Sequence, residues 1–99
     1  MISRQWKCIL KEEAHDRYIK FLNEVVFKEA QGLPGFIDAS IFKRKTGNGL
    51  EFMVATKWKD LNSIKAFAGN DINLAMVPDE AQKMMISFDK QVIHYEVVL

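Results

Sequence analysis

The sequence has a single cysteine and no long apolar run, and each shortage excludes a class of structure. Cys8 cannot form an intrachain disulfide or a thiolate zinc site by itself. No apolar stretch approaches the roughly 20 residues that cross a bilayer, and residues 1–7 lack the apolar core of a signal peptide. We therefore expect a cytoplasmic protein without a membrane segment.

An excess of charge of either sign is also missing. The 14 basic and 13 acidic residues leave a net charge of +1, so the composition predicts neither nucleic acid nor an anionic membrane as a partner. The 99 residues are 48% hydrophobic and 27% charged, as in an ordinary globular protein. A chain of this length forms one domain, which we place at residues 1–99.

A change of hydrophobic period separates the first strand from the first helix. Residues 2–10 alternate between two faces, which predicts a strand. From residue 12 to residue 31 the apolar positions recur every three or four residues, as on one face of an amphipathic helix. Gly-Leu-Pro-Gly at 32–35 then ends the helix. One face of the strand carries Ile2, Arg4, Trp6, Cys8 and Leu10.

The middle of the chain predicts a β-hairpin followed by helical pieces. Thr-Gly-Asn-Gly joins extended runs at 36–45 and 50–58, and Asn-Gly between alternating segments is a strong hairpin signal. Asp60 is placed to cap a helix that ends at Gly69. We expect another short helical piece over 71–77.

The C-terminal part completes a ferredoxin-like pattern. Pro78 and the two acidic residues after it predict the first turn of a helix over 81–87, and the valine-rich residues 91–99 predict a last strand. The order is βαββαβ, the split βαβ or ferredoxin-like arrangement. The predicted fold is therefore α+β, with a four-stranded antiparallel sheet.

Both faces of this sheet carry apolar side chains, which predicts assembly. The helices of so short a chain cover only one face, and the other would be a large exposed apolar patch. A homodimer with the two bare faces opposed is the simplest closed assembly. The alternation puts Phe36 and Phe42 opposite Ile37, Ala39 and Ile41, and it puts Leu50, Phe52, Val54 and Trp58 opposite Met53 and Ala55.

Short motifs spread over nearly the whole chain are typical of one family. They are Arg-Gln-Trp (4–6), Pro-Gly-Phe (34–36), WKDLNSIKAFAG (58–69) followed by Ala75 and Pro78, and Val-Ile-His-Tyr-Glu-Val (92–97). Together they resemble antibiotic biosynthesis monooxygenase domains, specifically small bacterial members of unassigned role. The resemblance implies a dimeric α+β barrel, in which two ferredoxin-like subunits face each other and each encloses a pocket.

The family includes cofactor-independent oxygenases of polycyclic aromatic quinols, haem-degrading enzymes and small isomerases or signal-processing proteins, so fold kinship leaves the reaction open. The haem-degrading branch uses an asparagine near the end of the first strand, a tryptophan at the end of the third, and a haem-ligating histidine in the second helical region. Trp58 matches the tryptophan. The other two positions fall at Lys7 or Cys8 and near Val77, so we expect neither haem degradation by that pattern nor another cofactor.

Five residues are candidates for the site: Arg4, Trp6, Trp58, Phe67 and His94. His94 titrates near neutral pH and would be the base that removes a phenolic or enolic proton. Pairing of the last strand with the first brings it towards Arg4 or Trp6, and Arg4 would stabilise a developing oxyanion. The aromatic side chains would line the pocket. The alternatives are that both tryptophans are core residues and that His94 makes a structural hydrogen bond.

The remaining chemically active side chains have plainer interpretations. His15 lies among acidic residues in a first helical turn, which predicts a solvated surface position. Cys8 is expected to be a small buried hydrophobe. The two histidines have no further ligands at metal-binding spacing. The loop 69–78 is either the moving edge of the pocket or a break caused by Pro78.

Three functions remain open from the sequence. The first is a cofactor-independent monooxygenase acting on an aromatic quinol-like small molecule, with His94 and Arg4 as its catalytic residues. The second is a non-catalytic dimeric module that binds a small apolar or aromatic ligand. The third is a structural dimer whose cavity is filled by its own aromatic side chains.

Overall fold

The first strand lies at the centre of the sheet. In the computed structural model, which describes residues 1–99, β1 (Ile2–Leu10) pairs antiparallel with β3 (Gly49–Trp58) along its whole length. β2 (Phe36–Thr46) pairs with the far side of β3, while β4 (Met85–Phe88) and β5 (Ile93–Glu96) share the other side of β1. The order β2-β3-β1-β4 confirms the predicted α+β, ferredoxin-like topology.

The predicted last strand is divided into two. β4 pairs with the end of β1, β5 pairs with its beginning, and residues 89–92 between them leave the ladder. The helix predicted over 81–87 was wrong in length, because α4 contains only Asp79–Gln82. The helical signal of Pro78 and the acidic residues is local and lasts one turn. Met85 then pairs with Leu10 and is buried in the core, which favours a strand.

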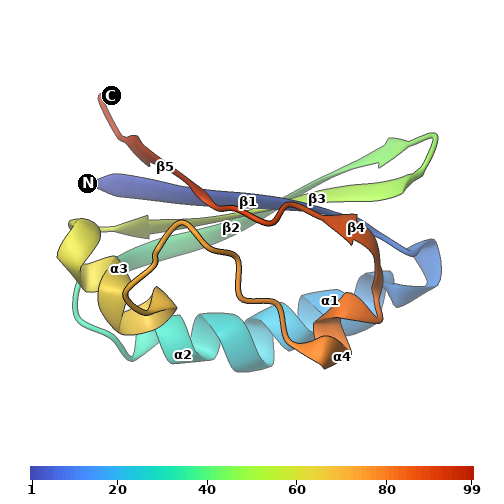
Figure 1. The fold of residues 1–99 in the computed structure, drawn as a ribbon, viewed down its shortest axis with the longest axis horizontal. Coiled ribbons are helices and arrows are strands. Elements are labelled where there is room, and N and C mark those ends of the chain that lie inside the picture. Colours follow the sequence, from blue (N-terminus) through green and yellow to red (C-terminus); the bar gives the residue numbers. More distant parts are fainter.

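The helix predicted over 71–77 was also wrong. Leu74 forms a β-bridge with Gln91, and backbone hydrogen bonds from Ala75 and Val92 flank the bridge. These bonds satisfy backbone groups that a helix would have paired internally. The segment is therefore an irregular loop, with a turn at residues 72–73, that passes beside the break between β4 and β5 (Figure 1).

The first helix forms where it was predicted but is not uniform. It begins with a 3₁₀ turn, Glu12–Ala14, followed by α1 (His15–Phe21), a π-helical segment (Leu22–Val26) and α2 (Phe27–Gln31). In the π segment the N–H of Phe27 donates to the carbonyl of Leu22, five residues earlier. The wider turn brings these two side chains to the same side of the helix, and both are buried.

The hairpin and the cap of α3 (Leu61–Ala68) agree with their sequence signals. Thr46 pairs with Gly49, so the turn consists of Gly47 and Asn48. The carboxylate of Asp60 accepts the backbone N–H of Ser63 at 2.9 Å, which satisfies one of the free donors at the start of α3.

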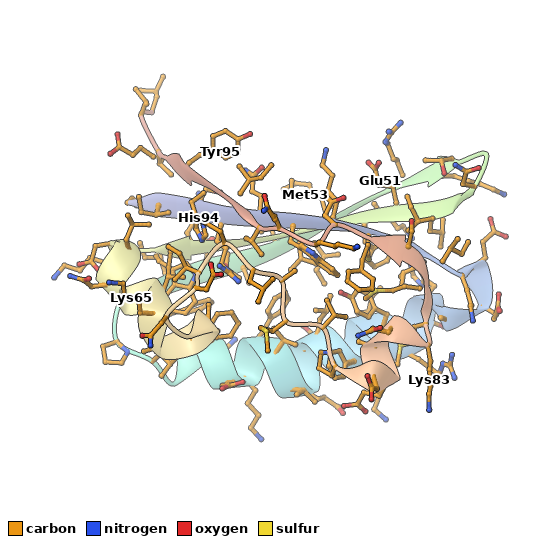
Figure 2. The ribbon with its side chains drawn as sticks, viewed as in Figure 1. Glu51, Met53, Lys65, Lys83, His94 and Tyr95 are labelled. Atoms are coloured by element: carbon orange, nitrogen blue, oxygen red, sulfur yellow. The ribbon has the colours of Figure 1, made fainter.

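All helices lie on one side of the sheet, and the other side is bare (Figure 1). Glu51, Met53 and Tyr95 project from the bare side in Figure 2. The alternation predicted for β1 and β3 is confirmed. On β2 it was wrong for Phe36, because a bulge at Ile37 shifts the register and turns the Phe36 ring inwards, against Trp58.

The core consists of two clusters under the helix-covered face. The larger is built around Leu10 and Phe52, and the smaller around Trp58 and Ile64; all four side chains are fully buried. No helix of the structure is long and apolar enough to span a membrane.

Candidate functional site

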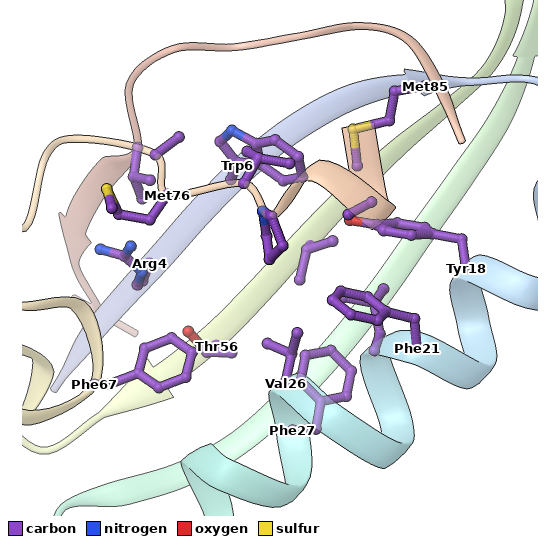
Figure 3. A pocket seen from close by; sticks show the side chains of 17 residues that line it. Arg4, Trp6, Tyr18, Phe21, Val26, Phe27, Thr56, Phe67, Met76 and Met85 are labelled. Carbon is purple, nitrogen blue, oxygen red and sulfur yellow. The ribbon is translucent and has the colours of Figure 1, made fainter. Parts of the chain in front are cut away.

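A cavity of about 130 Å³ lies between the sheet and the helices, where the two core clusters approach each other (Figure 3). Of its 17 lining residues 14 are hydrophobic, so it is an apolar cavity with few polar groups. The π-helical part of the first helix supplies one side of the cavity through Leu22 and Val26, and Phe27 at the start of α2 extends it. Residues 75–78 supply another, so the loop that the sequence singled out does border the cavity.

Three polar side chains form one row across the sheet at the end of this cavity. Arg4 on β1 lies opposite Thr56 on β3 and opposite His94 on β5. Directly opposed residues of antiparallel strands project from the same face, and here that face is the one covered by helices. Arg4 and Thr56 line the cavity, whereas His94 lies behind Arg4 and does not line it.

Arg4 is the charged group of the cavity. Its Nη1 donates to the carbonyl of Ile72 at 2.7 Å and to Nε2 of His94 at 2.9 Å. Its guanidinium carbon lies 6.0 Å from the centre of the Phe67 ring, within range of a cation–π contact. Burial lowers the pKa of Arg4 to about 10, so the side chain keeps its charge at neutral pH.

His94 serves Arg4 as a hydrogen-bond acceptor. The Arg4 guanidinium can only donate, so Nε2 of His94 accepts and the ring proton of the neutral imidazole is on Nδ1. Burial of the ring lowers the pKa of His94, and the neighbouring positive charge of Arg4 lowers it further. The register prediction that His94 approaches Arg4 is confirmed; its role as a base stays a prediction.

Thr56 is the site residue that the sequence analysis missed. It is the one buried polar residue, with 4% of its surface exposed, and its Oγ1 accepts the indole N–H of Trp58 at 2.8 Å. Because a hydroxyl carries one proton and that bond uses only an acceptor position, the Thr56 O–H remains free to donate. The sequence feature that could have identified Thr56 is a threonine on a strand face whose other side chains are apolar.

The aromatic candidates have different positions. Trp6 lines the cavity and donates its indole N–H to the carbonyl of Asp89 at 2.7 Å. Phe67 of α3 also lines it. Trp58 is fully buried outside the lining, packed between Phe36 and Phe67. It therefore acts on the site indirectly, by supporting Phe67 and fixing the Thr56 hydroxyl.

Two further residues can be compared with their predictions. Cys8 is buried as expected, and burial raises the pKa of its thiol to about 12. His15 is not the solvated residue predicted, because its ring packs edge-on against Phe52 and contacts Asp16 and Lys43 through its two nitrogens. No group of three or more histidine, cysteine, aspartate or glutamate side chains is arranged to hold a metal ion.

The sequence matches no protein-family model and no curated protein, but its fold has clear neighbours among solved structures. A protein of Bacillus cereus assigned as an antibiotic biosynthesis monooxygenase superposes with a TM-score of 0.69 and 19% identity, over 100% of this chain and 93% of the other. The haem degrader MhuD of Mycobacterium tuberculosis, with two haems in its active site, gives 0.67 and 16%, over 100% and 97%.

A third neighbour is the monooxygenase ActVA-Orf6 of Streptomyces coelicolor, solved with the ligand nanaomycin D. It superposes with a TM-score of 0.58 and 12% identity, over 99% of this chain and 90% of the other. At these identities the likeness establishes the fold. This chain therefore has the fold of antibiotic biosynthesis monooxygenase-type proteins, as its motifs predicted.

Proposed function

We propose that this protein is a cofactor-independent monooxygenase acting on an aromatic, quinol-like small molecule held as its oxygen anion. The observation that carries the proposal is a single guanidinium, Arg4, at the end of an otherwise apolar cavity. The occurrence of monooxygenases among the fold neighbours supports the reaction class. A fixed cation in a cavity of low polarity stabilises an anionic oxygen far more than water would.

The reaction requires only the substrate and oxygen. A phenol with a hydrogen at its para position and one O₂ contain the same atoms and electrons as a para-quinone and one water, so the substrate itself reduces the oxygen. The ionised phenol is the form rich enough in electrons to react. The ring carbon forms a bond to oxygen, the O–O bond breaks, and the displaced ring hydrogen leaves as a proton.

Arg4, the aromatic side chains and His94 have different roles in this reaction. Arg4 holds the anionic oxygen and thereby favours ionisation of the bound phenol. Trp6 and Phe67 provide apolar walls for the ring. His94 would receive the released proton only if its Nε2 were freed from Arg4, so its contribution in the observed arrangement is to orient the guanidinium.

Haem does not fit this cavity. A macrocycle of four pyrroles is much larger than the single ring that a cavity of about 130 Å³ accommodates. The lining contains no histidine or cysteine, and Val77, near the position of the expected haem ligand, lines the cavity with an apolar side chain. Burial and a hydrogen bond with Cys8 raise the pKa of Tyr18, which disfavours a phenolate ligand.

A non-catalytic binding module is the second candidate, and one observation favours it. The nitrogen of His94 that would act as a base already accepts a hydrogen bond from Arg4 at 2.9 Å. His94 itself does not line the cavity, and no side chain with an ordinary pKa near neutrality does. The same cavity would then bind the aromatic anion without oxidising it.

We include a homodimer in the proposal, with the two bare sheet faces opposed. Phe42 and Tyr95 on this face are about half exposed, and Met53 is partly exposed. Lys57 and Glu51 on the same face supply both signs of charge, which a twofold axis can bring into register. A Phe42→Glu variant should therefore be monomeric by light scattering at concentrations where the parent protein is dimeric. A parent protein that is monomeric at all concentrations would contradict the dimer.

Oxygen consumption tests the proposed reaction. Purified protein is given a panel of phenols and quinols in air-saturated buffer, with Arg4→Met as the test variant and Lys28→Met, an exposed lysine on α2, as its matched control. We expect uptake above the uncatalysed rate in the parent and in Lys28→Met, and its loss in Arg4→Met. Saturable binding without oxygen uptake would support the binding module instead. His94→Ala separates a base from an orienting residue, because a base would be needed for turnover but not for binding.

A further inference from the structure

We infer that the ligand of this cavity is a phenol with a single ring, bound as its phenolate, with the oxygen between Arg4 and Thr56. The inference rests on the proposed function for the oxidation of that ligand, whereas the binding mode depends on the geometry alone. It narrows the substrate from aromatic quinol-like molecules in general to phenols of one ring with a free para position.

The size of the cavity limits the ligand to one ring. Its volume is about 130 Å³, and a protein cavity of about 150 Å³ binds benzene. Sites for larger organic ligands usually measure about 300 Å³ or more. Because the cavity is partly open to solvent, the second of two fused rings would either lie outside it or displace lining side chains. These belong largely to the packed core, including Tyr18, Leu22 and Phe27.

The polar end of the cavity presents donors and no free carboxylate. Nη1 of Arg4 makes both of its protein hydrogen bonds, which leaves the N–H groups on Nη2 and Nε without protein acceptors. Thr56 lies directly opposite Arg4 in the ladder and has a free O–H. An anionic oxygen placed between them receives a charge-assisted bond from the guanidinium and a second bond from the hydroxyl. Figure 3 shows both side chains at one end of the cavity, beside Phe67.

The guanidinium is held in this orientation from behind. Nη1 of Arg4 donates one hydrogen bond to His94 on β5 and another to the carbonyl of Ile72 in the loop after α3. A guanidinium is planar, so fixing one nitrogen restricts where the other N–H groups can point. His94 is therefore a positioning residue for the phenolate site.

4-Nitrophenol is a suitable probe, because its absorption reports its ionisation and its blocked para position prevents turnover. Absorbance titrations over a range of pH give the pKa of the bound probe. We expect the parent protein to lower that pKa by about one unit, a preference for phenolate of about tenfold. The shift should disappear in Arg4→Met and decrease in Thr56→Val. It should return in Thr56→Ser, which restores the hydroxyl.

A separate pair of variants tests whether His94 positions the Arg4 guanidinium. His94→Gln keeps an acceptor near Arg4 and should retain most of the shift in the pKa of the bound probe. His94→Leu has no acceptor, so the guanidinium is less well oriented and the shift should be smaller. Circular dichroism and thermal unfolding of each variant establish that it is folded.

Two matched ligands test size and charge by calorimetry in the absence of oxygen. Toluene is close to phenol in volume but carries a methyl group in place of the hydroxyl. 1-Naphthol keeps the hydroxyl and adds a second fused ring. We expect both to bind at least about tenfold more weakly than phenol, measured above the pH at which phenol ionises on the protein. Equal binding of toluene, equal binding of 1-naphthol, or a pKa shift that persists in Arg4→Met would overturn the inference. If phenol binds as expected but no oxygen is consumed, the inference about the ligand stands and the proposed monooxygenase activity is refuted. If oxygen is consumed only with larger quinols, the proposed activity stands and the inference about the ligand is refuted.

Discussion

Replacement of Arg4 by methionine should weaken binding of the phenolate about tenfold at almost no cost in stability. The pKa of Arg4 falls from 12.5 to about 10 in the fold, which corresponds to a cost of about 3 kcal/mol for keeping the buried guanidinium charged. Because part of the side chain reaches solvent, we reduce this cost to about 2 kcal/mol. The hydrogen bonds to Ile72 and His94 offset it by about 1 kcal/mol each.

These opposing contributions nearly cancel, so Arg4→Met should change the free energy of unfolding by less than about 1 kcal/mol. Methionine is unbranched and of similar length, and Ile72 and His94 are partly exposed, so water can replace their lost partner. Urea unfolding followed by tryptophan fluorescence measures the change, with Lys28→Met as control. A loss of more than about 2 kcal/mol in Arg4→Met would show that Arg4 stabilises the fold and refute the reasoning.

The remaining predictions concern the backbone, the core and the pH dependence. Gly35→Ala should destabilise the protein by about 2 kcal/mol or more in calorimetry, because Gly35 has φ +88° and a Cβ there would lie 2.1 Å from Oγ of Ser63. Gly47→Ala, with nothing within 4 Å of a Cβ, should change stability little, and equal effects would contradict the argument. Phe52→Ala removes a fully buried ring and should cost about 3–5 kcal/mol in urea unfolding, so a smaller loss would mean that the core refills the space. The pKa of His94 is lower in the folded than in the unfolded state, so the unfolded state binds more protons and stability should fall as the pH drops from about 7 to about 5. His94→Gln should flatten this part of the stability profile, and an unchanged profile would assign it to other groups.

Much of the fold could be predicted because its signals are local. The period of two in residues 2–10, the period of three to four in 12–31 and the glycines of the hairpin act within a few residues of themselves. Asp60 caps α3 for the same reason, since its carboxylate reaches an N–H only three positions away. The motifs between 4 and 97 added the family resemblance, which the superpositions confirm as a likeness of fold.

Prediction failed where a distant strand competes with a local signal. The acidic turn after Pro78 favours a helix, but pairing with β1 ends it after one turn and converts residues 85–88 into a strand. Residues 71–77 likewise exchange helical bonds for a bridge to Gln91. The bulge at Ile37 reverses the face of Phe36, which strict alternation cannot foresee.

The candidate site divides in the same way between sequence and tertiary structure. The sequence by itself determined the residue types, the strand order and the alternation that turns Arg4, Trp6 and His94 towards the helices. Only the tertiary structure decided that Arg4 shares a row with Thr56, that His94 stands behind Arg4 rather than in the cavity, and that Trp58 supports the wall. Periodicity specifies which face a side chain occupies, whereas register and packing between distant segments specify its neighbours, and the chemistry of a site depends on those neighbours.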